Sequence, residues 1–315
     1  MIVFTHPDCL RHDPGRGHPE SPVRLQTVLA RLAQDGRFQV RRAEVAPRDP
    51  ILLVHPATYL MHLEESARRG GGRLDQDTVI NAASWDAALG AVGAVLAAVA
   101  SAHGGRDAFA AIRPPGHHAL AERAMGFCLL ANAVIGARHA QSLGRRRILI
   151  VDWDVHHGNG TQALVERDPS IRYVSLHQWP AYPGTGSAGE RGVGNIFNIP
   201  LPPGLPRERY VDALWNGIHE AGSRWDPDLI VISAGFDAMA GDPLGGFTLE
   251  PEDYAKLSLR IRQEFPSIPV VSVMEGGYHP ERLADGVMAH LAAFIPLPFA
   301  PPSGYTDSPA LPRSE

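Results

Sequence analysis

The sequence predicts an α/β fold in which an open, mostly parallel sheet is flanked by helices. Short apolar runs rich in β-branched residues alternate with helix-like stretches along the 315-residue chain. Several of these runs are apolar at consecutive positions, which is typical of parallel strands covered on both faces. Polar residues of unusual chemistry follow several of the runs, and ligands of open α/β sheets bind beyond the carboxyl ends of the strands.

Six segments are predicted as strands because they are short, apolar and rich in β-branched residues. In chain order they are MIVFTH at 1–6, RRILIVDWD at 146–154, IRYVSLH at 171–177, NIFNIPL at 195–201, DLIVISAGFD at 228–237 and PVVSVMEGGY at 269–278. Helices are predicted from apolar periodicity and length at 20–36, at 57–70, at 207–225 and over the Ala-rich stretch 87–100, with Ser84 as its N-cap.

The composition indicates a globular chain of one domain. Hydrophobic residues make up 44% and charged residues 20% of the sequence. Neither an internal repeat nor a Ser/Gly-rich linker divides it, so we expect a single domain over 1–315. The segment 296–315, PLPFAPPSGYTDSPALPRSE, is rich in proline and polar residues and is expected to be an irregular tail.

Charge, cysteine content and hydropathy exclude several classes of protein. A net charge of -5 gives no polycationic surface for direct nucleic-acid binding. The two cysteines, Cys9 and Cys128, do not form a disulfide framework and fit a reducing compartment. No signal peptide is visible, and the longest apolar run, 87–100, is shorter than the roughly 20 residues that span a bilayer. We therefore expect a cytoplasmic protein without a membrane partner, whose oligomeric state the sequence leaves open.

The strongest chemical signal is the segment VDWDVHHGNGTQ, where a buried strand ends in carboxylates and imidazoles. Such groups are costly to bury unless they are paired or bind a metal. Asp152, Asp154 and His156 alternate along the chain and can point to the same side. A divalent cation would offset the repulsion between the two carboxylates, and Asp237 of SAGFDAMAGDPLGG would add a third ligand. Three protein ligands with an open position describe a catalytic metal site. The simpler alternative is that the aspartates cap turns and His156 is a packed histidine.

Two further motifs carry groups suited to proton transfer and to oxyanion binding. In RPPGHHA, the proline pair and Gly116 present His117 and His118, which titrate near neutrality. In MEGGYH, Gly276 permits a close approach and the hydroxyl of Tyr278 can donate to a developing oxyanion. Taken alone, adjacent histidines are often surface residues and a tyrosine after Gly-Gly is usually a turn residue.

Taken together and in order, these motifs resemble the zinc-dependent histone deacetylase family. The set is RPPGHHA, GFCLLANA, VDWDVHHGNGTQ, AYPGTG, SAGFDAMAGDPLGG and EGGYH, and the forms EGGY and DPLGG are most similar to its class II and bacterial histone deacetylase-like branch. The resemblance runs from GHPESPVRL near the start to EGGYH. It implies the arginase–deacetylase fold and hydrolysis of an acetylated amine.

The resemblance also assigns roles to individual residues. Asp154, His156 and Asp237 would bind one catalytic Zn²⁺, with His117, His118 and Tyr278 as catalytic groups. Asp152 and Asn159 would orient the two histidines, and Asn159 is a departure from the aspartate of many members. Further implied positions are the tunnel residues Gly126, Phe127, Tyr182, Leu244 and Gly276, Arg24 near an acetate exit, and Asp152 with Ser175 at a monovalent-cation site, usually K⁺.

The predicted activity is removal of acetyl or other acyl groups from the side-chain amine of acetyl-lysine, with release of acetate. An acetylpolyamine deacetylase would use the same chemistry, and polyamine-selective members carry a glutamate where Leu244 stands. A catalytically inactive acyl-lysine-binding module would have no need of the complete set of ligands, histidines and tyrosine. A binuclear ureohydrolase on the same fold would need carboxylates where Gly158 and Met239 stand. A serine hydrolase has no support because G-x-S-x-G is absent.

Overall fold

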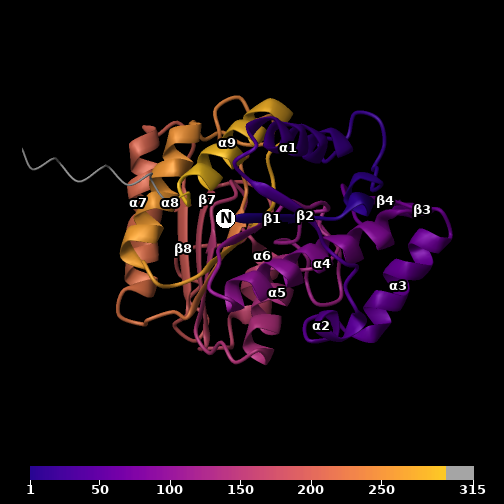
Figure 1. Cartoon of the computed structure of the whole chain (residues 1–315), viewed down its shortest axis with the longest axis horizontal. Coiled ribbons are helices and arrows are strands. Elements are labelled where there is room, and N and C mark those ends of the chain that lie inside the picture. Colours follow the sequence, from indigo (N-terminus) through magenta and orange to yellow (C-terminus); the bar gives the residue numbers. More distant parts are fainter. Residues whose placement is uncertain (296–315) are drawn as a thin grey trace, which may run out of the picture.

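The computed structural model describes residues 1–295 and is built on one eight-stranded parallel sheet (Figure 1). The predicted irregular tail, 296–315, lies outside the described residues. The strand order is β2-β1-β5-β10-β9-β6-β7-β8, and each neighbouring pair is parallel. The strands are β1 (Ile2–Thr5), β2 (Gln39–Arg42), β5 (Ala108–Ala110), β6 (Ile148–Asp152), β7 (Ile171–Gln178), β8 (Ile196–Leu201), β9 (Leu229–Ala234) and β10 (Val270–Met274).

Helices cover both faces of the sheet (Figure 1). On one face α1 (Pro22–Asp35), α9 (Pro280–Ala292), α8 (Pro251–Glu264) and α7 (Arg207–Gly222) pack side by side. On the other face α4 (Ser84–His103), α5 (Asn132–Ser142) and the short α6 (Asn159–Val165) form the second layer. The remaining elements are η1 (Pro7–Leu10), α2 (Arg48–Leu52), α3 (Ala57–Arg68) and the antiparallel hairpin β3 (Gly71–Arg73) and β4 (Val79–Asn81).

All six predicted strands are present, and their burial explains why they could be read from the sequence. β6, β9 and β10 are buried at every position, which gives the continuous apolar runs expected of central parallel strands. The strands that were not predicted are short or polar. β5 has only three residues, and β2 reads QVRR with every residue exposed. Their place in the sheet depends on pairing with β1 rather than on their own pattern.

The Ala-rich stretch forms α4, but the predicted N-cap at Ser84 is wrong. Ser84 is the first helical residue, and its buried hydroxyl bonds Asn81 and His12 instead of a helix N–H group. Within residues 1–295, α4 is the one helix long and apolar enough to cross a membrane, and 72% of that window is buried inside the protein. Gly93 allows this close packing, since a Cβ there would lie 1.9 Å from the carbonyl oxygen of Glu44. α4 is therefore a core helix.

The strand register places the chemically unusual residues at one edge of the sheet. Asp152 pairs with Ser233 of β9 on one side and with Ser175 of β7 on the other. Because all these strands are parallel, the segments that follow β6, β9 and β10 leave the sheet at the same edge. These segments carry Asp154, Asp237 and Glu275, and so the topology brings residues far apart in sequence into contact.

The central strands should dominate stability. Leu149 of β6 is 0% exposed, so truncation to alanine leaves a core cavity. We expect Leu149→Ala to lower the free energy of unfolding by about 2–5 kcal/mol. Leu53 is 53% exposed, and Leu53→Ala should change stability by at most about 0.5 kcal/mol. Urea denaturation of both variants checks this, and equal midpoints would contradict the assigned core.

Candidate active site

The three predicted metal ligands meet at the carboxyl edge of the sheet. Asp154 and His156 follow β6, and Asp237 follows β9. One ligand atom from each lies within 4.8 Å of the others. His156 Nδ1 is 3.0 Å from Asp154 Oδ1 and 3.2 Å from Asp237 Oδ2, so one imidazole nitrogen faces two carboxylates. The aspartates are fully buried and His156 is nearly so. Imidazole nitrogen and carboxylate oxygen are both ligands for a divalent metal, and three protein ligands leave a position open as in catalytic sites.

The surroundings of these ligands fit a bound divalent cation. Asp237 Oδ2 is buried and lacks a hydrogen-bond partner, whereas Asp237 Oδ1 accepts the Val155 N–H. Burial and the neighbouring Asp154 raise the pKa of Asp237 to about 7, because the two carboxylates lack sufficient positive charge between them. Gly276 leaves the space open, since a Cβ there would lie 2.1 Å from Asp237 Oδ2. A cation would compensate the charge and use the free oxygen.

The tandem histidines lie beside the ligands but have different partners. His117 Nδ1 donates to Asp152 Oδ2 at 3.1 Å, and Tyr173 donates to the same oxygen at 2.9 Å. His118 Nδ1 lies 2.8 Å from Asn159 Oδ1 at the start of α6. The amide oxygen can only accept, so Nδ1 carries the proton and Nε2 of His118 has a free lone pair. The structure thus pairs each histidine with the residue that the resemblance assigned to it.

These partners shift the two pKa values in opposite directions. Burial lowers the pKa of His117, but the carboxylates of Asp154 and Asp152 outweigh it and raise the value to about 10. A divalent cation near Asp154 would reduce this shift. Burial and the charges on His117 and His156 lower the pKa of His118 well below its usual range. His118 is therefore the neutral member of the pair and the one suited to accept a proton.

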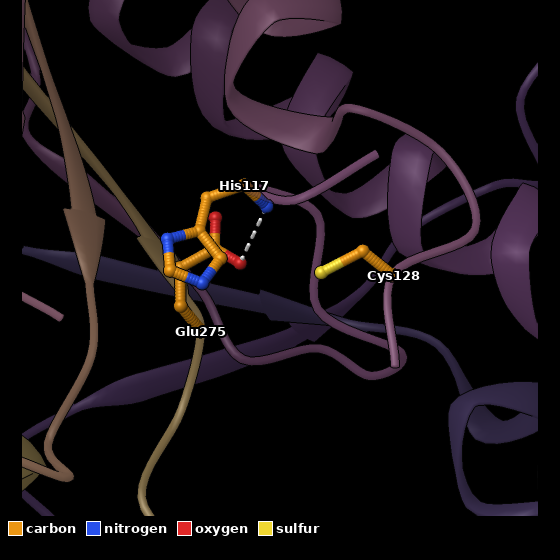
Figure 2. Close-up of side chains that lie close together, drawn as sticks. All are labelled: His117, Cys128 and Glu275. Carbon is orange, nitrogen blue, oxygen red and sulfur yellow. Dashed lines mark hydrogen bonds between the residues drawn. The ribbon is translucent and has the colours of Figure 1, made fainter. Parts of the chain in front are cut away.

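His117 also belongs to a second group of ligand-type residues, with Cys128 and Glu275 (Figure 2). Each member of this group already has hydrogen-bond partners. Glu275 accepts backbone N–H groups, and the Cys128 thiol donates to Gly126 O at 3.3 Å. Burial raises the pKa of the Cys128 thiol well above its usual range, whereas a metal ligand must be a thiolate. We interpret this group as a hydrogen-bonded support for the histidines.

A cavity of about 270 Å³ leads from the surface to the ligands and is called the tunnel below. Its lining residues are Asp77, His118, Gly126, Phe127, His156, Ala181, Tyr182, Leu244 and Tyr278. The tunnel therefore joins predicted metal, catalytic and substrate residues in one space. Of the other predicted substrate positions, Gly276 lies behind the ligands, where its N–H donates to Asp154 Oδ2 at 2.9 Å.

The aromatic walls are held by unusual backbone geometry and by edge contacts. Gly126 has a φ of 55°, and a Cβ there would lie 2.3 Å from the ring of His118. Phe127 follows at a φ of 68° and meets Tyr278 edge-on, with centroids 5.7 Å apart. Tyr182 lies edge-on to His118 at 5.1 Å and is 40% exposed. Only glycine fits at position 126, which explains the Gly-Phe pair.

Tyr278 enters the tunnel from the segment after β10. Burial raises the pKa of its hydroxyl well above the usual value, so the group remains a hydrogen-bond donor. Its N–H donates to Asp242 Oδ2 at 2.6 Å, and the Arg24 guanidinium lies 4.8 Å from the centre of its ring. The structure therefore places Arg24 beneath Tyr278. The acetate-exit role of Arg24 stays a prediction.

Arg24 is part of a buried ionic network that sequence reasoning did not find. Its Nη1 bonds Glu20 at 2.9 Å, and its Nε donates to Gly277 O at 2.6 Å. Arg113 donates two hydrogen bonds to the Glu20 carboxylate, at 2.6 and 2.8 Å. Burial raises the pKa of Glu20, but Arg113 outweighs it, and the value falls well below the usual range. The network fixes the loop of the tandem histidines to α1.

Ser175 and Asp152, the predicted monovalent-cation pair, are register partners on β7 and β6. Ser175 Oγ lies 2.9 Å from His177 Nδ1, and Asp152 Oδ1 accepts the Asp154 N–H at 3.2 Å. The structure brings the two side chains together on adjacent strands. Potassium binding stays a prediction.

Asp77 and Asp242 were not singled out from the sequence, and Glu275 was noted at a strand end without a role in the site. Asp242 lies in the motif that gave Leu244 and accepts N–H groups from both Leu244 and Tyr278. Glu275 stands beside Gly276 in EGGY, where it was read only as the end of a strand. Asp77 follows Asp75 in the β3–β4 hairpin, and this acidic pair was the available signal. None of these residues could be placed without the fold.

Comparison with known proteins identifies the family. A family model described as a histone deacetylase domain matches residues 18–294. The chain belongs to the histone deacetylase family. It is 38% identical to the histone deacetylase-like amidohydrolase of Pseudomonas aeruginosa, over 83% of this chain and 73% of that protein. It is also similar to the HDA15 HD domain, with 34% identity, a TM-score of 0.88 and coverage of 92% and 88% of the two chains.

A second solved structure is also similar to this chain. The acetylpolyamine aminohydrolase of Burkholderia pseudomallei is 29% identical, with a TM-score of 0.86 and coverage of 93% of this chain and 98% of that one. The family and its relatives establish that this protein is a hydrolase acting on amide bonds, a deacetylase of the histone deacetylase family. The α/β fold with a parallel sheet, predicted from the sequence, is confirmed.

The ligand geometry predicts one divalent metal per chain. Asp237 supplies the free carboxylate oxygen of the set, so Asp237→Ala should reduce bound metal from about one equivalent to near zero. Elemental analysis after dialysis checks the count. The control is Asp212→Ala, which removes an exposed aspartate of α7 and should leave the metal content unchanged. Two tightly bound metals in the wild type would contradict the assignment.

Proposed function

We propose that this protein is a zinc-dependent amidohydrolase that removes acetyl groups from the side-chain amine of acetyl-lysine and releases acetate. The observation that carries the proposal is that members of three functional groups, His156, His118 and Tyr278, line one tunnel. The three groups are the Asp154, His156 and Asp237 ligand set, the free Nε2 of His118 and the hydroxyl of Tyr278. A metal, a base and an oxyanion donor together are sufficient for hydrolysis of an unactivated amide.

The ligand set supports zinc as the metal. One imidazole and two carboxylates suit a tetrahedral site with an open position, as in catalytic zinc centres. The chemistry that zinc supplies at such a site is Lewis acidity toward a carbonyl oxygen and a water molecule. The protein contributes the buried, water-poor surroundings, in which the ligand aspartates are 0% exposed.

The proton steps follow from the hydrogen bonds of the histidines. His118 Nε2 takes a proton from the attacking water, because Asn159 holds the other ring proton on Nδ1. His117 stays beside it, with its ring oriented by the hydrogen bond to Asp152. Tyr278 donates its hydroxyl hydrogen to that oxyanion. His118 then returns its proton to the nitrogen as the C–N bond breaks, and acetate and a free amine leave.

Residues at the entrance of the tunnel distinguish between the two candidate substrates, acetyl-lysine and an acetylpolyamine. Leu244 is 39% exposed at the lining and offers apolar contact to the stem and backbone of an acetyl-lysine. Its N–H donates to Asp242 Oδ1 at 2.9 Å, which holds the backbone of Leu244 at this position. A glutamate here would instead attract the distant ammonium of an acetylated polyamine. Leu244 therefore supports acetyl-lysine as the preferred substrate.

One observation favours the second candidate, an acetylpolyamine. Asp77 also lines the tunnel, and among residues 1–295 no Lys, Arg or His nitrogen lies within 4.0 Å of its carboxylate. Its neighbour Asp75 differs, because Arg123 bonds it at 3.0 Å. Within the described residues, the Asp77 carboxylate accepts only the Thr78 hydroxyl, at 3.2 Å, and could therefore receive the ammonium of a polyamine. One relative in structure is an acetylpolyamine aminohydrolase.

Tyr278→Phe tests the oxyanion role. Removing the hydroxyl should lower kcat by on the order of 100- to 1000-fold, since the donor acts mainly on charge that develops in the transition state. Metal content and melting temperature should stay at wild-type values, because no hydrogen bond of the hydroxyl supports the fold in residues 1–295. Steady-state kinetics on an acetyl-lysine peptide checks this. Near wild-type turnover would show that Tyr278 is only a turn residue.

The substrate class is tested by comparing kcat/KM for an acetyl-lysine peptide and for acetylspermidine. We expect the wild type to prefer the peptide and Leu244→Glu to gain activity toward acetylspermidine, because the new carboxylate would attract the distant ammonium. Asp77→Asn is the matched variant for the second candidate. A wild-type preference for acetylspermidine that Asp77→Asn removes would favour the polyamine and contradict the argument from Leu244.

A further inference from the structure

We infer that Glu275 is a positioning residue that clamps the Gly116–His117 peptide and thereby holds the tandem histidines in register with the metal ligands. The inference rests on the proposed function, since it concerns the same histidines. Glu275 does not line the tunnel and so has no route to the substrate. Its side chain is nevertheless fully buried beside His117 (Figure 2).

The two carboxylate oxygens of Glu275 accept hydrogen bonds from different segments of the chain. Oε2 accepts the N–H of Gly116 at 2.6 Å and the N–H of His117 at 3.2 Å. Oε1 accepts the hydroxyl of Ser233 on β9 at 3.2 Å. Burying a carboxylate costs free energy unless donors surround it, and three donors from two separate segments do so here. The side chain therefore connects the end of the sheet with the loop that carries the histidines.

The backbone around Glu275 touches the other parts of the site. Its carbonyl accepts a hydrogen bond from Arg24, and the N–H of Gly276 donates to Asp154. Tyr278 follows three residues later. One short segment after β10 thus contacts a metal ligand, supplies the oxyanion donor and, through Glu275, holds the loop of the proton-transfer groups. A shift of the loop would change the distance between His118 and the ligands.

The other hydrogen bonds to the backbone of residues 116–118 involve neutral groups. The His118 N–H meets only the weak acceptor Cys128 Sγ, at 3.4 Å. The His117 carbonyl accepts the Thr161 N–H at 3.0 Å, which holds one end of the peptide. Glu275 is the only charged acceptor that receives an N–H of residues 116–118 in the described part of the chain. Misplacing a catalytic group by about 1 Å can cost on the order of 100-fold in rate.

Substitutions of Glu275 can distinguish the effect of its hydrogen bonds to the loop, here called the clamp, from the effect of its negative charge. In Glu275→Gln the amide oxygen can take the place of Oε2 and accept both N–H groups, while the amide nitrogen donates to Ser233. This variant keeps the clamp and removes the charge. Glu275→Asp keeps the charge but is one methylene too short to reach the peptide. Glu275→Leu removes both, and Glu252→Leu, at an exposed glutamate of α8, is the control for substitution alone.

The experiment measures kcat and KM on an acetyl-lysine peptide together with metal content. We expect Glu275→Gln to keep kcat within about threefold of the wild type. Glu275→Asp and Glu275→Leu should lose on the order of 10- to 100-fold in kcat with KM unchanged, because Glu275 is outside the tunnel. Rescue by Gln but not by Asp supports the clamp. If Gln is as inactive as Leu, or Asp as active as the wild type, the charge matters and the clamp is wrong.

Hydrogen exchange of the backbone amides in residues 113–120 tests the clamp without measuring enzyme activity. Protection of the Gly116 and His117 amides should persist in Glu275→Gln and fall in Glu275→Asp. A wild type without deacetylase activity but with this exchange pattern would refute the proposed function and leave the clamp intact. Equal protection in the wild type, Glu275→Gln and Glu275→Asp would refute the clamp, whatever the activity.

Discussion

Four buried carboxylates at one edge of the sheet set the main physical constraint on this structure. Asp152, Asp154, Asp237 and Glu275 are all 0% exposed, and each needs donors or positive charge to be tolerated there. Backbone N–H groups serve Asp154, Asp237 and Glu275, and Tyr173 with His117 serves Asp152. One oxygen, Asp237 Oδ2, is left over, and it faces the imidazole of His156. The positions of the donors and histidines in the site are explained by the need to compensate the negative charge of these carboxylates.

The same constraint makes two adjacent histidines chemically different. His117 lies against the carboxylates of Asp152 and Asp154, which favour its charged form, whereas His118 meets the neutral amide of Asn159 and the positive charge of its neighbour. A carboxylate at position 159 would favour the imidazolium form of His118 and compete with its role as a base. The amide keeps the ring oriented without that effect. The different roles of His117 and His118 therefore come from their partners, Asp152 and Asn159, rather than from the histidines themselves.

Much of the fold and of the site could be predicted because the informative residues lie in local patterns. The buried strands β6, β9 and β10 are continuous apolar runs, and the residues that follow them form motifs of known spacing. The features that were not predicted from the sequence, or were predicted wrongly, have a common cause. β2 is polar and exposed, Ser84 bonds Asn81 instead of the helix, and Glu20 is buried only because Arg24 and Arg113 surround it. Such features depend on partners remote in sequence, which a local pattern does not contain.

Substrate specificity at the tunnel mouth also depends on residues that are remote in sequence and that a local pattern does not reveal. Motif reading singled out Leu244, because its position is marked by the surrounding GDPLGG. The fold adds Asp77, which lies 167 residues earlier in the numbering (244 − 77) and yet lines the same cavity. An apolar residue and a carboxylate that has no ion-pair partner in residues 1–295 thus line one cavity. Their effects on a substrate differ in range, since apolar contact acts only where surfaces touch, while a charge near a low-dielectric wall acts over several ångströms. The proposed selectivity between acetyl-lysine and an acetylpolyamine therefore depends on how far from the amide the substrate carries its next charge.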